Sequence, residues 1–159
     1  MEPVTLKIKK LPNCQALPQY ATSGSAGLDL TAALTEPLTF AAGARGRVPT
    51  GIVVEIPEGF EGQVRPRSGL ADKAGLSLTN CVGTIDSDYR GEVIALVINH
   101  GDKPYTIEPG ERIAQLVIMP VPRVEIVEVE EVSDGNQRGD KGFGSSGRTA
   151  WTSDYRGQP

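Results

Sequence analysis

The residues with the most chemical potential lie close together between Asn80 and Gly91. An amide (Asn80), two carboxylates (Asp86 and Asp88) and a tyrosine (Tyr89) fall within ten residues of one another. An amide can hydrogen-bond the edge of a heterocycle, and a carboxylate can accept a proton as a general base. Asp and Ser side chains also form ordinary turns by bonding their own backbone. The segment therefore fits either a nucleotide site, with Asn80 on the base and Asp86 as proton acceptor, or a plain turn.

A second candidate is an anion cradle at Pro66–Gly69. This segment stands at the start of a predicted helix over 68–75. Unpaired backbone N–H groups and the helix dipole favour an anion at such a terminus. Arg67 and Ser68 add a cation and a hydroxyl. Ser68 is also explained as a plain N-cap, with Gly75 as the C-cap of the same helix.

Two further segments carry polar groups beside apolar runs. The adjacent Glu111 and Arg112 are typical of a structural ion pair, whereas Gln115 can donate to a phosphate oxygen. Asp29 stands in a stretch of small and apolar residues. A partly buried carboxylate needs a partner or a metal shell. Asp29 is therefore either a structural hydrogen-bonding hub or a support for a metal ion.

The composition changes abruptly at Ser133. The 27 residues from Ser133 to Pro159 contain six glycines and four serines and no Val, Ile, Leu or Met. Such a segment cannot bury a core of its own. We expect residues 1–132 to form the folded core and residues 133–159 to form a flexible arm. Its basic residues and Phe143 fit either a solvated tail or a lid that closes over an anionic ligand with a flat ring.

Short apolar runs separated by turn residues must position these groups. The chain has 19 glycines and 12 prolines, which is too many for a helical bundle. β-Branched or alternating runs at 52–56, 92–98, 113–119 and 124–129 predict strands. The sequence therefore predicts an all-β sandwich or barrel with one short helix.

Composition also narrows the class of partner. A net charge of −4 argues against a protein that coats DNA or RNA, and no apolar run approaches the length of a membrane span. The first residues show no secretory signal. Cys14, Cys81 and the single His100 lack the spacing of a zinc site. We therefore expect a cytoplasmic protein with reduced thiols, and neither a nucleic-acid polymer nor a membrane as partner.

Taken in order, five short segments closely resemble the motifs of the trimeric deoxyuridine triphosphate nucleotidohydrolases (dUTPases). One such motif alone is weak, but five in this order with sensible spacing are specific. The resemblance runs from about residue 20 to residue 147. The segments are Ala-Gly-Leu-Asp-Leu at 26–30, Pro-Arg-Ser-Gly-Leu-Ala at 66–71, Gly-Thr-Ile-Asp-Ser-Asp-Tyr-Arg-Gly-Glu at 83–92, Gly-Glu-Arg-Ile-Ala-Gln-Leu at 110–116 and Arg-Gly-Asp-Lys-Gly-Phe-Gly-Ser-Ser-Gly at 138–147.

The resemblance implies a fold, an assembly and a reaction. The fold is a distorted jelly-roll β-barrel with one short helix and a glycine-rich C-terminal arm. The assembly is a homotrimer with active sites at the subunit interfaces. The reaction is Mg²⁺-assisted attack of water on the α-phosphate of dUTP, which gives dUMP and pyrophosphate. In such enzymes the phosphates of the substrate hold most of the Mg²⁺ coordination.

The resemblance also implies roles for residues on the nucleoside side. Asp86 corresponds to the general base that orients the attacking water. Asn80 would hydrogen-bond the uracil edge, helped by backbone groups around Thr84 and Ile85. Tyr89 would pack under the deoxyribose and exclude a 2′-hydroxyl.

On the phosphate side, the implied contacts come from three of the other motifs. Arg67, Ser68 and Gly69 would bind phosphates from a neighbouring subunit, and Gln115 would add another phosphate contact. Asp29 would support the water shell of Mg²⁺ indirectly.

The arm supplies the remaining implied contacts. Arg138 would pair with the γ-phosphate and Phe143 would stack on uracil. Gly144, Ser145 and Ser146 would close over the triphosphate. This sequence departs from the motif at Lys141, where the family usually has glycine, so the closing equilibrium of the lid is expected to differ if that position needs φ > 0.

Two other functions fit parts of the same pattern. A deoxycytidine triphosphate deaminase resembles this fold and binds a similar nucleotide, but it releases ammonia instead of pyrophosphate. A non-catalytic nucleotide sensor would bind dUTP without consuming it. The Phe-bearing arm and the Ile85–Tyr89 segment favour the hydrolase.

Overall fold

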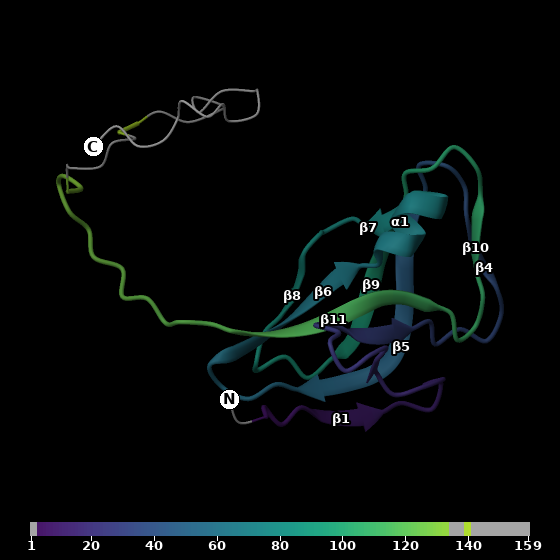
Figure 1. The fold of residues 1–159 in the computed structure, drawn as a ribbon, viewed down its shortest axis with the longest axis horizontal. Coiled ribbons are helices and arrows are strands. Elements are labelled where there is room, and N and C mark those ends of the chain that lie inside the picture. Colours follow the sequence, from purple (N-terminus) through teal and green to yellow (C-terminus); the bar gives the residue numbers. More distant parts are fainter. Residues whose placement is uncertain (1–2, 134–138, 141–159) are drawn as a thin grey trace. The chain divides into compact units, whose positions relative to one another are not determined.

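The computed structural model describes residues 3–133, 139 and 140. The chain divides into two compact units, Met1–Arg123 and Val124–Pro159. Figure 1 traces the chain, with the strands and the helix all in the first unit. The predicted arm residues Arg138, Lys141, Phe143, Gly144, Ser145 and Ser146 lie outside the described residues.

The all-β prediction is confirmed. The described part of the chain contains eleven strands and one helix. These elements are β1 (Lys7–Lys10), β2 (Gln19–Tyr20), β3 (Leu28–Thr31), β4 (Leu38–Phe40), β5 (Arg45–Glu55), β6 (Phe60–Pro66), α1 (Ser68–Ala74), β7 (Leu76–Leu78), β8 (Gly83–Ile85), β9 (Glu92–Asn99), β10 (Tyr105–Ile107) and β11 (Arg112–Pro120).

The strands form two larger sheets and one small ribbon. One sheet has the order β1-β5-β9-β7, the other has the order β2-β3-β11-β6-β8, and β10 pairs with β4. Buried apolar side chains from both larger sheets make one core, which includes Leu30, Ile52, Val93 and Leu116. Many paired strands are far apart in the sequence. Strand pairing and the shared core therefore fix the relative positions of residues that no local sequence pattern connects.

Strand β9 shows how the sequence pattern produces this core. Its residues alternate between half-buried and buried positions, with Val93, Ala95 and Val97 fully inside. Period-two alternation places one side of a strand in the core. The strand ends at the buried Asn99, whose Nδ2 donates to the carbonyl groups of Phe40 and Lys103 at 3.0 and 2.8 Å. These bonds satisfy an amide that burial alone would make costly.

The short helix α1 corrects one prediction. The N-cap is Arg67, not Ser68, and it makes no side-chain cap hydrogen bond. Ser68 is instead the first residue of the helix. The predicted C-cap is confirmed, because Gly75 has φ 67° and its N–H donates to the carbonyl groups of Ala71 and Leu70.

The strand predicted over 124–129 is wrong. Strand β11 ends at Pro120, and the structure describes no strand beyond it up to Ser133. The alternation is real, but Val124 and Ile126 are 79% and 92% exposed. Pro120 and Pro122 lack backbone donors, so they interrupt the ladder before the run begins.

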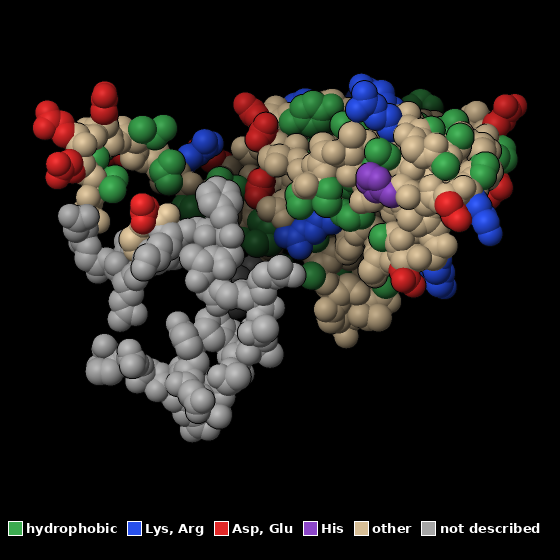
Figure 2. Space-filling view, turned by 90° about the horizontal axis from the view of Figure 1, so that it is seen from above, with side chains coloured by type: hydrophobic (Ala, Val, Ile, Leu, Met, Phe, Trp, Pro, Cys, Tyr) green, Lys and Arg blue, Asp and Glu red, His purple; other side chains and the backbone are tan. Residues whose placement is uncertain are grey.

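The surface carries both signs of charge. On the face drawn in Figure 2, lysine and arginine side chains are interspersed with acidic ones. In the described part of the chain, no helix is long and apolar enough to cross a membrane.

The turn that leads into β11 is held by a tyrosine–carboxylate contact. The Tyr105 hydroxyl donates to Glu111 Oε1 at 2.5 Å, and Glu111 Oε2 accepts from the backbone N–H of Glu108 at 3.0 Å. Burial, followed by the hydrogen bond and charge of Glu111, raises the pKa of Tyr105 to about 12. Glu111 is thereby committed to this turn, immediately before Arg112.

This contact predicts a loss of stability in alkali. Because the folded-state pKa of Tyr105 is raised, its stabilising contribution is complete below the ordinary tyrosine pKa of about 10. The contribution is lost as the pH rises through about 12. We expect the difference in unfolding free energy between the wild type and Tyr105→Phe, measured by urea denaturation, to shrink over this range. A difference that stays constant with pH would show that ionisation of Tyr105 is not coupled to folding.

Candidate active site

Five of the predicted nucleoside-side residues line one cavity. It has a volume of about 250 Å³, and its lining includes Asn80, Thr84, Ile85, Asp86 and Tyr89. We call it the nucleoside pocket. Strand β8 supplies one wall and pairs antiparallel with β6, with Thr84 opposite Gln63. The start of β9 supplies another wall through Glu92, Ile94 and Leu96.

Strand β8 is an edge strand. It stands last in its sheet and pairs with β6 alone among the described strands. The backbone N–H and C=O groups on its other side are therefore free to pair with a ligand. Asn80 lies beside this strand, because a Cβ built at Gly83 would come within 3.0 Å of Asn80 Nδ2. An amide and a row of backbone groups together can match the donors and acceptors of a heterocycle.

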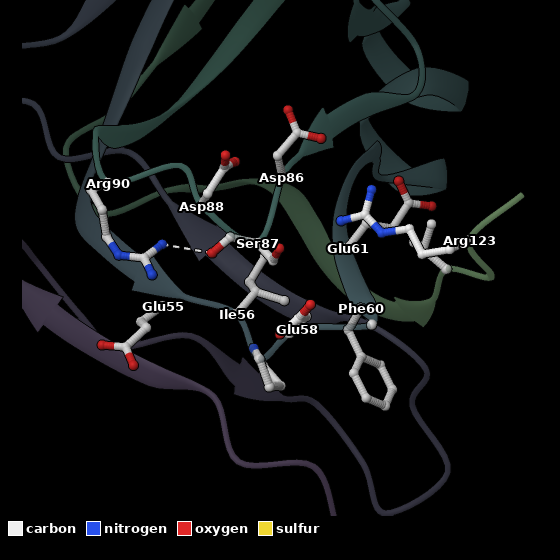
Figure 3. Close-up of a pocket in the computed structure, with 13 residues that line it drawn as sticks. Glu55, Ile56, Glu58, Phe60, Glu61, Asp86, Ser87, Asp88, Arg90 and Arg123 are labelled. Atoms are coloured by element: carbon white, nitrogen blue, oxygen red, sulfur yellow. Dashed lines mark hydrogen bonds between the residues drawn. The ribbon is translucent and has the colours of Figure 1, made fainter. Parts of the chain in front are cut away.

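Asp86 stands where two cavities meet. It lines the nucleoside pocket and also a larger groove of about 680 Å³, which also holds Glu58, Glu61, Asp88 and Arg123 (Figure 3). In the described part of the chain, its exposed carboxylate has no hydrogen-bond or ion-pair partner. An unpaired carboxylate at the mouth of a pocket can accept a hydrogen bond from water and then its proton.

The loop that carries Asp86 is fixed by its neighbours. Arg90 Nη1 donates to the Ser87 carbonyl oxygen at 2.6 Å (Figure 3). It also donates to the Tyr89 carbonyl oxygen at 2.9 Å. The backbone N–H of Tyr89 donates to the Asp86 carbonyl at 3.1 Å. These bonds close a turn, so the turn interpretation of the segment is confirmed, and the turn leaves the Asp86 carboxylate at the mouth of the pocket.

The predicted phosphate-side residues line a second cavity. It also has a volume of about 250 Å³, and its lining includes Asp29, Arg67, Ser68, Gly69 and Gln115. We call it the anion pocket. It shares no lining residue with the nucleoside pocket. Within one copy of the chain, the predicted site is therefore divided between two places.

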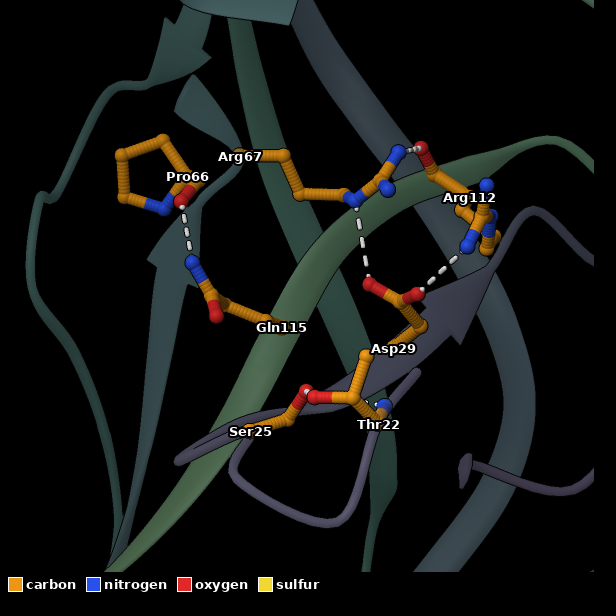
Figure 4. A network of polar contacts seen from close by, with 7 residues as sticks. All are labelled: Thr22, Ser25, Asp29, Pro66, Arg67, Arg112 and Gln115. Carbon is orange, nitrogen blue, oxygen red and sulfur yellow. Dashed lines mark hydrogen bonds and ion pairs between the residues drawn. The ribbon is translucent and has the colours of Figure 1, made fainter. Parts of the chain in front are cut away.

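Asp29, which lines the anion pocket, pairs with two arginines. Its Oδ1 lies 3.0 Å from Arg67 Nε and its Oδ2 lies 2.9 Å from Arg112 Nη1 (Figure 4). Arg67 Nη1 also donates to the Arg112 carbonyl at 3.0 Å. The Asp29 side chain is only 16% exposed, so these contacts are partly shielded from water. The carboxylate fixes the direction in which Arg67 points.

Arg112 corrects the predicted Glu111–Arg112 ion pair. Glu111 bonds Tyr105, and Arg112 pairs with Asp29 from 83 residues away. The sequence did not indicate this role for Arg112. The signal that was available is Asp29 itself, an acid in an apolar stretch that required a partner.

A strand irregularity brings Arg112 and Gln115 to one face. These residues are three apart, which in a regular strand places them on opposite faces. The register of β11 against β3 shifts between Arg112 and Ala114, so Arg112 lies opposite Thr31 and Gln115 lies opposite Asp29. Thr31 and Asp29 are two apart and share a face. The bulge therefore places Arg112 on the same face as Gln115 of the anion pocket.

Gln115 is held against two backbone neighbours. Its Nε2 donates to the Pro66 carbonyl at 2.9 Å (Figure 4). A Cβ at Gly27 would overlap Gln115 Oε1, so the amide rests directly on the glycine backbone. This close approach explains the glycine of the Ala26–Leu30 motif.

Comparison with known proteins identifies the family. The family model described as dUTPase matches residues 14–147. The chain belongs to the dUTPase family. A deoxyuridine 5′-triphosphate nucleotidohydrolase of Rhizobium rhizogenes is 58% identical over 133 residues, which are 82% of this chain and 85% of that protein.

Solved dUTPase structures share the fold. A mutant dUTPase of Staphylococcus bacteriophage 80alpha, solved with dUpNHpp, superposes with a TM-score of 0.82 at 32% identity, covering 91% of this chain and 99% of that one. A mutant dUTPase of the S. aureus phage phi11, whose structure describes the coordination of a structural Mg(II) ion, superposes with a TM-score of 0.73 at 26% identity. The match covers 82% of this chain and 99% of that one. The expected dUTPase jelly-roll fold is thereby confirmed.

The metal-ligating side chains available in the chain limit how a metal ion can be bound. Among residues 3–133, 139 and 140, no three His, Cys, Asp or Glu side chains are grouped so that they could hold a metal ion. Both Asp29 oxygens are already bonded to arginines. This arrangement suits a cation that arrives with a polyphosphate and meets the chain through water.

The shielded Asp29 cluster predicts a measurable effect on stability. Asp29→Asn removes the negative charge between two arginines. We expect it to lower the unfolding free energy by about 1–2 kcal/mol, which is in the lower part of the range for hydrogen bonds to charged groups because the Arg112 side chain is half exposed. The matched control is Glu55→Gln, which breaks the exposed Lys7–Glu55 pair at 2.7 Å. Urea denaturation should show a much smaller loss for the control. Equal losses would contradict a special role for the cluster.

Proposed function

We propose that the chain hydrolyses dUTP to dUMP and pyrophosphate by attack of water on the α-phosphorus. The observation that carries this proposal is that one cavity gathers Asn80, Thr84, Ile85, Asp86 and Tyr89 in a member of the dUTPase family. The reaction keeps uracil out of DNA and supplies dUMP for thymidylate synthesis.

Base recognition uses the edge of β8. The Asn80 amide and backbone groups around Thr84 and Ile85 bond the polar edge of uracil. A site built to bond one edge leaves its own polar groups unpaired when cytosine enters, and that mismatch is expensive. Tyr89 forms the wall beneath the deoxyribose and excludes a 2′-hydroxyl.

Asp86 is the proposed catalytic base. Its carboxylate orients a water molecule and accepts a proton as the oxygen attacks phosphorus. The absence of a protein partner on this carboxylate in the described chain keeps its acceptor oxygens available. A positioned carboxylate contributes about 10²–10⁴-fold to rate in such reactions.

The phosphates are bound by residues of a neighbouring subunit. Arg67, Ser68, Gly69 and Gln115 line a pocket that shares no residue with the nucleoside pocket, which supports a site completed by a second copy of the chain. A homotrimer with sites at its interfaces supplies that copy. Arg138, Phe143, Gly144, Ser145 and Ser146 of the arm, residues 133–159, close the site around uracil and the triphosphate.

The substrate is the magnesium complex of dUTP. When bound, Mg²⁺ neutralises phosphate charge as it develops. Among the described residues that line the anion pocket, Asp29 is the one carboxylate, and it reaches the hydration shell of the ion instead of ligating it directly. We place the activity in the cytoplasm, where Cys14 and Cys81 stay reduced, and we expect neither a nucleic-acid polymer nor a membrane as partner.

Replacing the base tests the mechanism. Asp86→Asn keeps the size of the side chain and removes its basicity, so we expect turnover of dUTP to fall by about 10²–10⁴-fold. Binding of dUpNHpp, measured by calorimetry, should change little. Pyrophosphate and ammonia are assayed together, because ammonia released from dCTP would indicate a deaminase. Turnover within a few-fold of wild type would exclude Asp86 as the base.

Mixing two inactive variants tests the shared site. Asp86→Asn lacks the base and Arg67→Ala lacks a phosphate contact, so each homotrimer should be inactive. After joint refolding in equal amounts, about a quarter of the sites should combine an intact Asp86 with an intact Arg67 from another copy. We expect dUTP hydrolysis to recover to about that fraction of wild type. If the mixture stays inactive, the two residues act within one chain and the interface site is wrong.

A further inference from the structure

The ring of Tyr89 lies directly on the backbone of Gly91. A Cβ built at Gly91 would come within 2.5 Å of Tyr89 Cζ and 3.0 Å of Cε2, and closer still to the hydroxyl oxygen. Real Cβ atoms do not approach other atoms so closely. The tyrosine is 43% exposed, so no neighbouring core packs it into this position.

The Tyr89 ring is the nearest group that a side chain at residue 91 would meet. Gly91 is not among the glycines with positive φ in the described chain, which include Gly51 and Gly75. No left-handed backbone conformation therefore requires glycine at residue 91. The restriction on residue 91 arises from contact with Tyr89 and not from the turn itself.

The hydroxyl group of Tyr89 is hydrogen-bonded to the first residue of β9. The Tyr89 hydroxyl donates to the Glu92 carbonyl at 3.1 Å. Glu92 begins β9, and its Oε1 accepts from the backbone N–H of Gly51 at 2.8 Å. Next to it, the buried Thr50 hydroxyl donates to the Val93 carbonyl at 2.6 Å. The register of β5 against β9 shifts between Pro49 and Val53, which turns these groups of β5 toward β9.

We propose that Gly91 is a positioning residue for sugar selection, because its missing side chain sets the depth at which the Tyr89 ring forms the wall of the nucleoside pocket. This inference rests on the proposed function. A methyl group at residue 91 must move the ring by roughly 1 Å to restore ordinary van der Waals contact. That displacement also breaks the hydrogen bond to Glu92. The pocket is then no longer shaped to exclude one additional hydroxyl oxygen.

The test compares sugar preference in Gly91→Ala and the wild type. We expect the ratio of kcat/KM for dUTP to kcat/KM for UTP to fall by about tenfold or more. The KM for dUTP should rise more than kcat falls, because Asp86 is untouched. The matched control is Gly24→Ala, since a Cβ there would meet nothing within 4 Å and φ is not positive. Its ratio should equal that of the wild type.

Two Tyr89 variants separate the ring from its hydroxyl. Tyr89→Phe keeps the ring on Gly91 and should retain most of the preference for dUTP. Tyr89→Ala removes the wall and should lose the preference, and adding Gly91→Ala to it should change the ratio no further. A ratio within twofold of wild type in Gly91→Ala, or in Tyr89→Ala if Gly91→Ala does not fold, would overturn the proposal.

A stability cycle tests the contact without any activity. Gly91→Ala should lower the thermal midpoint in the wild-type background and leave it nearly unchanged in the Tyr89→Ala background. Equal losses in the two backgrounds would overturn the proposal. If the wild type fails to hydrolyse dUTP while this coupling is present, the proposed function fails and the contact stands.

Discussion

The backbone ladder of β6 is the interaction on which both pockets depend. Along one edge β6 pairs with β8, which forms a wall of the nucleoside pocket. Along the other edge it pairs with β11, which carries Arg112 and Gln115. Its own chain continues directly into Arg67 and the start of α1. A single strand therefore fixes the backbone positions of residues in both pockets.

Polar side chains near the surface need such a scaffold because they lack the packing that fixes core residues. Asp29, Arg67 and Arg112 hold one another through charge-assisted bonds, which are directional and shielded on one side by the sheet. Gln115 and Tyr89 are positioned differently, by resting on the glycines Gly27 and Gly91. The motifs thus combine residues that perform chemistry with residues whose small size places them.

Much of this arrangement was predictable from local pattern. The run at 92–98 forms a strand because its buried residues alternate onto one face, and the run at 113–119 forms a strand with buried residues at adjacent positions. Gly75 ends the helix, where φ is positive. The run at 124–129 has the same pattern and forms no strand, since alternation does not reveal whether a partner strand is available. The Asp29–Arg112 pair and the bulge beside Arg112 depend on register between distant strands, which a single sequence does not encode locally.

The Asp29 carboxylate has a further electrical consequence for the proposed reaction. Two guanidinium groups surround one carboxylate, so the cluster carries a net excess of one positive charge. A pocket with both arginines unneutralised would attract a triphosphate more strongly, but it would also retain the pyrophosphate after the bond is cut. In the proposed reaction, internal neutralisation by Asp29 would weaken that retention while preserving the direction of Arg67. The carboxylate that orients the arginine would then also favour departure of the leaving group.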